Sequence, residues 1–196
     1  MNKTINNDEI ERYSRQIVLK DVGIVGQKKI LNSKILVVGA GGLGCPVIDI
    51  LTRSGAKNIT IADNDKVSLS NLHRQTMYNT FDIGKFKVDV VKKKIKQINP
   101  SSKIKIIKKR ISNINLSKII NKFDILVDGS DNFKTKFLLN EYSIKYKKIL
   151  IVGAISKFDG HVFTFNFKNQ NIPCLKCFYQ SEPSDEILNC EAEGIM

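Results

Sequence analysis

The 196-residue sequence predicts a doubly wound α/β fold with a mostly parallel sheet, an antiparallel edge and an N-terminal helical segment. Short apolar runs alternate with longer segments of helical periodicity, an order typical of parallel sheets. The run Lys34-Ile-Leu-Val-Val is apolar throughout, as expected for a strand covered on both faces. Residues 160–167 instead alternate polar and apolar side chains, which indicates an antiparallel edge strand.

The remaining elements follow from local patterns. Residues 8–20 form a predicted helix because Ile10, Tyr13 and Ile17 share one stripe and two acids lie in its first turn. A second short helix is predicted from Gly26 to Asn32. A single domain over 1–196 is expected. Further helices are predicted at 45–54, 85–97 and 133–147, and further strands at 58–62, 103–108, 123–127 and 149–155. Another helix is predicted before the strand at 123–127, and residues 64–84 are predicted to form a polar loop.

Composition excludes several classes of protein. With 42% hydrophobic residues the chain is not disordered, and no stretch approaches the length of a membrane-spanning helix. The start of the chain has no apolar secretory segment, and four cysteines do not form a disulfide scaffold, so a cytoplasmic location is expected. Most of the net charge of +13 lies in residues 85–110, where 11 basic side chains face one acid. Phe86 is the only aromatic residue among them, so the segment has no platform on which bases could stack, which argues against a nucleic-acid partner.

A glycine-rich segment follows the first strand and opens a helix. In Gly39-Ala-Gly41-Gly42-Leu-Gly44 the first, third and sixth positions suit a tight turn, a close phosphate and helix packing. Asp63 ends the second strand, where its carboxylate can accept hydrogen bonds from ribose hydroxyls. The pattern predicts a Rossmann-like nucleotide site; the alternative is a glycine turn in a protein that binds no nucleotide.

Polar residues beyond Asp63 distinguish the nucleotide. Arginine and lysine suit a triphosphate, and aspartate suits its Mg²⁺, whereas a dehydrogenase needs neither. These side chains follow the carboxyl ends of strands, where such sheets bind ligands. The candidate residues are Asp65, Asn71, Arg74, Lys87, Asp131 and Asn132.

Six segments of the sequence form recognisable motifs: Arg12-Tyr-Ser-Arg15-Gln-Ile, Gly39-Ala-Gly-Gly-Leu-Gly-Cys-Pro, Asp63-Asn-Asp-Lys-Val-Ser-Leu-Ser-Asn-Leu-His-Arg-Gln-Thr76, Gly84-Lys-Phe-Lys87, Asn99-Pro100 and Ser130-Asp-Asn132. Together they resemble the ThiF/MoeB-type adenylyltransferases, which are relatives of ubiquitin-activating enzymes. The resemblance covers nearly the whole chain, and the stretch from Asp63 to Thr76 is its most specific part.

The resemblance implies ATP-dependent adenylylation of the C-terminal glycine carboxylate of a small ubiquitin-fold sulfur carrier, ThiS-like or MoaD-like, in thiamine or molybdenum cofactor biosynthesis. It implies that Asp63 holds the ribose, that Asn71, Arg74 and Lys87 hold phosphates, and that Asp131 coordinates Mg²⁺. Arg15 matches an arginine that reaches into a partner subunit's site, which implies a homodimer.

The cysteines near the end of the chain extend the resemblance in part. Cys174-Leu-Lys-Cys177 has the spacing of two zinc ligands, and the family completes a structural Zn²⁺ site with a second such pair. This chain ends at Met196 before a second pair, so the resemblance implies that the family's C-terminal portion is lacking. Cys190 matches a cysteine that forms a covalent bond with the carrier in some relatives.

Other functions stay open at this point. An oxidoreductase dependent on NAD or FAD would use the same glycine segment, but Arg74, Lys87 and Asp131 argue against it. A nucleic-acid-binding module would use the basic segment. A truncated, inactive relative is the third alternative. Each residue taken alone also has a structural explanation. Arg15 could lie on a solvated helix face, Asp65 could form a turn, and Lys87 could be a surface lysine. The cysteines could be thiols that bind no metal.

Overall fold

The computed structural model describes residues 5–169 and 172–179, and within them six strands form one sheet in the order β3-β2-β1-β4-β5-β6. Neighbouring strands from β3 to β5 pair in parallel and β6 pairs antiparallel with β5, so the predicted fold class is confirmed. The strands are β1 Lys34–Val38, β2 Asn58–Ala62, β3 Lys103–Ile107, β4 Ile125–Asp128, β5 Ile149–Ser156 and β6 Asp159–Asn166.

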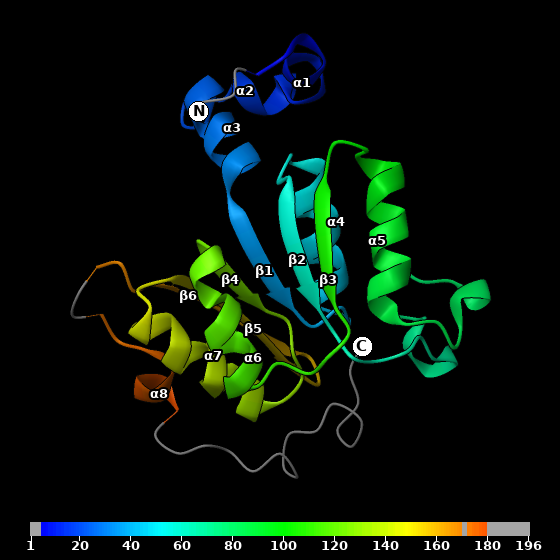
Figure 1. Ribbon diagram of the computed structural model, residues 1–196, viewed down its shortest axis with the longest axis vertical. Helices are drawn as coiled ribbons and strands as arrows, with labels where there is room; N and C mark the ends of the chain where they lie inside the picture. The colour runs from blue at the N-terminus through cyan, green and yellow to red at the C-terminus, as the bar shows by residue number, and fades with distance from the viewer. Residues whose placement is uncertain (1–4, 170–171, 180–196) are drawn as a thin grey trace.

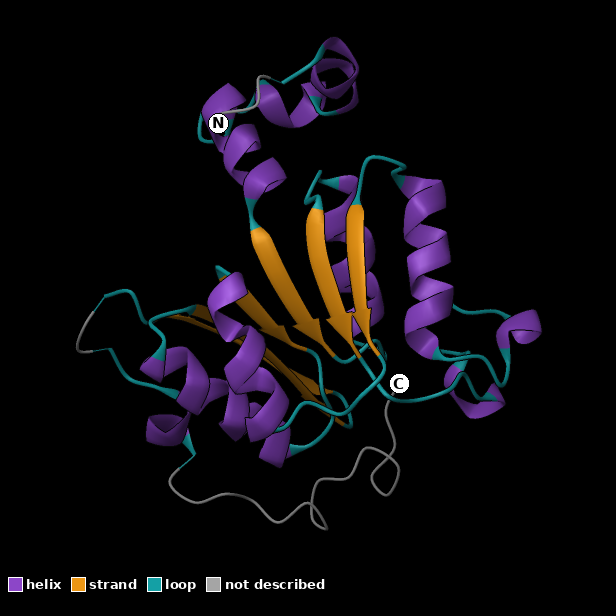
Figure 2. Cartoon of the chain, viewed as in Figure 1, coloured by secondary structure: helices purple, strands orange, loops and turns teal. Residues whose placement is uncertain are grey.

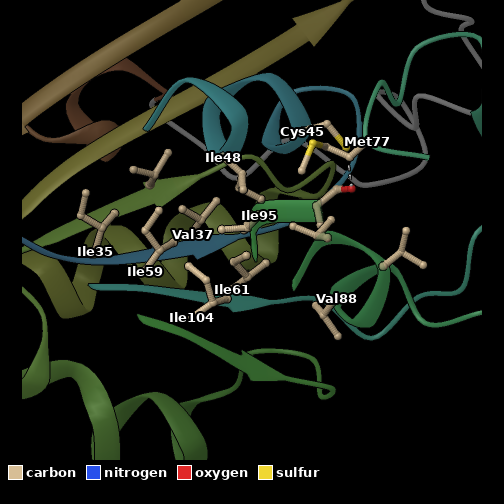
Figure 3. Packing of buried hydrophobic residues seen from close by; sticks show 14 of the residues in the cluster. Ile35, Val37, Cys45, Ile48, Ile59, Ile61, Met77, Val88, Ile95 and Ile104 are labelled. Carbon is tan, nitrogen blue, oxygen red and sulfur yellow. Dashed lines mark hydrogen bonds between the residues drawn. The ribbon is translucent and has the colours of Figure 1, made fainter. Parts of the chain in front are cut away.

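Helices cover both faces of this sheet (Figures 1 and 2). One face carries α4 Gly44–Arg53 and α5 Lys87–Ile98; the other carries α6 Asn113–Ile119, α7 Phe133–Lys145 and the short α8 Leu175–Phe178. Each face therefore has its own apolar core. Figure 3 shows the first core, where Cys45 and Ile48 of α4 pack over Val37, Ile59 and Ile61 of the sheet.

The N-terminal segment differs from the prediction of one helix over 8–20, which is wrong. It forms α1 Asn7–Arg12 and α2 Ser14–Ile17, separated at Tyr13 (φ −106°, ψ 14°). The break lets the Tyr13 ring become buried, with 1% of its surface exposed, while its hydroxyl accepts a hydrogen bond from Asn99 Nδ2 at 3.0 Å. The third helix, α3 Gly23–Asn32, begins three residues before the predicted start at Gly26.

The N-terminal helices lie at the amino ends of the strands, opposite the ends at which the arrows of Figure 1 point. An ion pair between Lys57 and Glu9 fastens α1 to the start of β2, and Arg12 donates to the carbonyl of Ile98 at 3.2 Å. This placement leaves the carboxyl ends of the strands uncovered by α1–α3.

The remaining connections are short or weakly helical. The predicted polar loop at 64–84 contains two 3₁₀ turns, Leu69–Asn71 and Thr80–Asp82, and a third, Ile120–Lys122, follows α6. The helix expected before β4 is α6. Over the described part of the chain, every helix is too short or too polar to cross a lipid bilayer.

Candidate active site

A cavity of about 620 Å³ opens at the carboxyl ends of the parallel strands. The register aligns Val38 of β1 with Ala62 of β2 and Asp128 of β4, so the loops that leave these strands begin at one level. The cavity is lined by the loops after β1 to β4, by the end of β5, by the 71–75 turn, by Lys87 and by the start of β6. Polar groups far apart in the sequence therefore face a single space.

The glycine segment forms the floor of this cavity. Gly39 has φ +91°, a conformation that side-chain-bearing residues rarely adopt, and a Cβ built there would lie 2.6 Å from the carbonyl oxygen of Gly129. A Cβ at Gly44, the first residue of α4, would lie 2.0 Å from the carbonyl oxygen of Gly39. The segment is therefore packed backbone against backbone, and the positive end of the α4 dipole lies beside the cavity.

Asp63 connects the glycine segment to the end of β2. One carboxylate oxygen accepts from the N–H of Ala40 at 2.7 Å, and the other accepts from the N–H of Asp65 at 2.7 Å. Burial raises the pKa of Asp63, whereas these two N–H groups and the charge of Lys87 act to lower it. The carboxylate lines the cavity and keeps lone pairs for further donors, as a ribose ligand requires.

A turn at residues 71–75 covers the glycine segment. The N–H groups of Arg74 and Gln75 both donate to the carbonyl of Asn71, at 3.3 and 3.0 Å, so these residues form one turn. The aliphatic part of Arg74 lies over Gly42, and its guanidinium donates to the carbonyl of Ser70 at 3.3 Å. Arg74 is thereby held at the cavity wall with donors left for an anion.

Lys87 supplies a second cation, although only 5% of its surface is exposed. Its Nζ lies 3.0 Å from the Asp65 carboxylate, and its backbone N–H donates to the carbonyl of Asp65 at 3.0 Å. An ammonium has three donors, so this ion pair leaves two for a ligand. Asp65 is therefore the partner of Lys87 in this structure, and both line the cavity.

The loop after β4 brings acids to the opposite side. Asp131 is exposed and lines the cavity, and among the described residues its carboxylate accepts one hydrogen bond, from Asn132 Nδ2 at 3.3 Å. Asn132 also caps α7, because its Oδ1 accepts from the N–H of Thr135 at 2.9 Å. Asp128, in contrast, is buried with 1% exposed.

The structure brings most of the predicted site residues together. The cavity lining includes Gly39, Gly41, Gly42, Asp63, Asp65, Asn71, Arg74, Lys87, Asp131 and Asn132. Gly44 is the first residue of α4 and is not among the residues that line the cavity. Arg15 does not line the cavity of its own chain and is exposed on α2. Cys174 and Cys177 lie outside the cavity, and Cys190 lies outside the described residues.

Sequence reasoning missed several residues that line the cavity. Lys136 and Gln75 are 4% and 3% exposed, and the side-chain oxygen of Gln75 finds no partner among the described residues. Lys109 and Arg110, from the basic segment, also line the cavity, as does His161. Gln75 lies within the Asp63–Thr76 motif, which was a signal in the sequence, whereas Lys136 resembles the many surface lysines of this chain.

The Cys174–Cys177 pair is compact. The two Sγ atoms are 3.8 Å apart. Burial acts to raise the pKa of Cys174, but hydrogen bonds that include the Cys177 N–H and the Asn140 side chain outweigh it, and the pKa is lowered. Residues 5–169 and 172–179 contain no group of three or more His, Cys, Asp or Glu side chains that would hold a metal.

Comparison with known proteins gives consistent matches. The ThiF family profile matches residues 13–196. The adenylyltransferase and sulfurtransferase MOCS3 of Drosophila virilis is 38% identical over 194 residues, which cover 98% of this chain and 43% of that protein. The sulfur carrier protein adenylyltransferase of Thermus thermophilus is 35% identical over 192 residues, which cover 96% and 71%. The chain thus spans less than half the length of the MOCS3 relative.

Solved structures share the fold. The E. coli MccB complex with AMPCPP and MccA has a TM-score of 0.73 and 25% identity, covering 90% of this chain and 51% of that chain. PaaA has a TM-score of 0.77 at 23% identity, covering 88% and 59%. At this identity PaaA supports the fold alone.

Proposed function

Because the chain belongs to the ThiF family, we propose that it uses ATP to adenylylate the C-terminal glycine carboxylate of a small ubiquitin-fold sulfur carrier protein. The names of two relatives, a sulfur carrier protein adenylyltransferase and an adenylyltransferase and sulfurtransferase, support this activity over a dehydrogenase. The pathway, thiamine or molybdenum cofactor biosynthesis, stays a prediction, as does the cytoplasmic location.

One observation carries the proposal: Arg74, Lys87 and Asp131 converge on the same cavity as the glycine segment and Asp63. Two cations and the α4 dipole suit a triphosphate, and a free carboxylate suits its divalent cation. A dinucleotide-dependent oxidoreductase needs no divalent cation at its phosphates, so it would give this carboxylate no role. The cavity of about 620 Å³ is also large enough for a nucleotide together with the end of an extended peptide.

The chemistry follows from these groups. The carrier carboxylate attacks the α-phosphorus of ATP, the bond to the bridging oxygen breaks, and pyrophosphate leaves while the carrier retains AMP as an acyl-adenylate. Asp63 accepts from the ribose, and the backbone at Gly41 lets the phosphates approach. Arg74 and Lys87, with Asn71 beside them, stabilise the charge that develops on the α-phosphoryl group and on pyrophosphate.

Asp131 fits Mg²⁺ by its donor set. Its oxygens face the cavity with one long hydrogen bond from Asn132, and hard oxygen ligands are those that Mg²⁺ prefers. Mg²⁺ is commonly held by one or two carboxylates together with substrate phosphates, so a single acid suffices. When bound there, the cation neutralises charge on the phosphates.

A homodimer accounts for two features. Arg15 does not line its own cavity, so its proposed action on the nucleotide requires a second subunit. The N-terminal segment also exposes large apolar side chains, which a subunit interface would bury: Ile10, Val18, Leu19, Ile24 and Val25.

Zinc is proposed at Cys174 and Cys177, with further ligands from outside the described residues. The short Sγ–Sγ distance and the lowered pKa of Cys174 favour thiolates that share one cation. Metal analysis of the purified protein should find about one zinc per chain for a complete site, or about one per two chains for a site shared between subunits. A lower content would exclude both arrangements, and Cys174→Ser should remove the metal.

The activity is tested by ATP–pyrophosphate exchange. Exchange should require a ThiS-like or MoaD-like carrier with its terminal glycines and should vanish when they are removed, because the carboxylate is the nucleophile. Lys87→Ala should lower exchange about 10²-fold, because a buried cation that meets the phosphates is lost.

Lys85→Ala is the matched control for Lys87→Ala. Lys85 lies two residues earlier, is exposed and pairs with Asp82 at 3.3 Å rather than with a cavity residue. Its loss should leave exchange within about twofold of the wild type, as for most surface substitutions.

The proposed activity itself would be contradicted if the wild-type protein showed no exchange with any carrier. That result would favour an inactive relative.

A further inference from the structure

We propose that Lys136 and Asp128 are positioning residues that fix the loop 129–132, and with it Asp131, in the geometry that binds Mg²⁺ with ATP. This inference rests on the proposed function and adds two residues that act through Asp131. It is carried by a buried ion pair whose hydrogen bonds all end on the loop or on the two strands beside it.

Lys136 joins three parts of the cavity wall. Its Nζ lies 3.2 Å from the Asp128 carboxylate and donates to the carbonyls of Ser130 and Gly153, each at 2.7 Å. These contacts use all three ammonium donors. Lys136 therefore has no donor left for a nucleotide, although it lines the cavity, and its contacts connect the end of β4, the loop and β5.

Asp128 holds the same loop from the other side. Its second carboxylate oxygen accepts from the N–H of Ser130 at 2.9 Å and from the Ser130 hydroxyl at 2.5 Å. Ser130 thus has its N–H and hydroxyl bound to Asp128 and its carbonyl bound to Lys136. The residue immediately before Asp131 is fixed at every polar atom, which limits the directions that the Asp131 carboxylate can take.

The pair also separates the two acids by function. Asp128 is buried and neutralised by Lys136, whereas Asp131 is exposed and, within the part of the chain that the structure describes, accepts only the bond from Asn132. A cation entering the cavity therefore meets one uncompensated carboxylate on this loop. Without Lys136, the charge on Asp128 would compete for the same cation and draw the loop inward.

Stability alone is a weak reason for such a pair. Burying two charges costs desolvation energy that their attraction only just repays, and apolar substitutes of similar volume are often as stable. A buried pair that contributes little to folding, yet binds every polar atom next to a proposed metal ligand, is better explained by positioning.

The test measures ATP binding by calorimetry, once with excess Mg²⁺ and once with EDTA. Lys136→Met alone leaves Asp128 buried and unpaired and can fail to fold, so the main variant is the double substitution Asp128→Asn with Lys136→Met. Its affinity in EDTA should stay near that of the wild type. Its affinity with Mg²⁺ should fall about tenfold or more, as when groups that support a metal ligand are lost.

Two further variants separate positioning from general damage. Lys136→Arg keeps the buried cation and should retain most of the gain in affinity that Mg²⁺ gives. Lys134→Met removes an exposed lysine from the same helix and should change nothing. On an Asp131→Asn background the double substitution should cause no additional loss, because the residue through which the pair acts is already altered.

Two results with the double variant would contradict the proposal. If the double variant keeps the full Mg²⁺-dependent gain, or loses affinity equally in Mg²⁺ and in EDTA, the pair does not position Asp131 and the proposal is wrong. Pyrophosphate exchange is measured separately. A protein that binds ATP with Mg²⁺ but exchanges with no carrier contradicts the proposed function without altering this binding comparison.

Discussion

Replacing Asp131 by alanine is expected to lower carrier-dependent ATP–pyrophosphate exchange by about 10³-fold, to the limit of detection. Asp131 is the exposed carboxylate of the loop after β4, so its removal would deprive the proposed Mg²⁺ of the protein ligand that we assign to it. Exchange of labelled pyrophosphate into ATP, with the carrier in excess, is the measurement.

The fold should survive this substitution, because Asp131 is exposed and its side chain supports little else. Asp49→Ala is the control: Asp49 pairs with Arg53 at 2.9 Å on the outer side of α4 and does not line the cavity. Near-normal exchange by the Asp131 variant would refute its role, whatever the control does.

Gly44→Ala is expected to destabilise the protein by at least about 3 kcal/mol, a large share of the stability of a domain this size. The new Cβ would lie 2.0 Å from the carbonyl oxygen of Gly39, a backbone atom that no side-chain rotation can move away. Either α4 separates from β1 or the glycine turn opens. Urea unfolding of both proteins measures the difference.

Gly41→Ala is the matched control within the same segment. A Cβ at Gly41 would meet the Gln75 side-chain nitrogen at 3.7 Å, an ordinary contact. Its stability should therefore remain within about 1 kcal/mol of the wild type, while its affinity for ATP falls, because the methyl group occupies the side from which a phosphate approaches. Equal stability of the two variants would contradict the packing argument for Gly44.

Patterns in the sequence predicted the elements whose burial is regular. In β1 the buried residues Ile35 to Val38 are apolar on both faces because helices cover both faces of the sheet, and such a run can be recognised in the sequence. No pattern in the sequence indicated the helix break at Tyr13. A tyrosine is compatible with a helix, and only the distant Asn99 and the space beside Gly55 make its burial favourable.

The residues of the candidate site also differ in how well the sequence could predict them. Residues that belong to a contiguous motif, such as Asp63 and Arg74, could be named in advance because the motif carries its own chemistry. Lys136 could not, since its role depends on acceptors from three separate elements that meet only in the folded chain. A chain with 27 lysines hides one buried lysine among many exposed ones.

The contact between the glycine segment and the loop after β4 has an evolutionary consequence. A Cβ at Gly39 would collide with Gly129, and a Cβ at Gly129 would lie 3.1 Å from the nitrogen of Gly44, so three positions share one space. A side chain gained at one cannot be offset by a smaller residue at the others, because none is smaller than glycine. Compensating mutations at these three positions are therefore not available, and we expect all three to resist substitution during evolution.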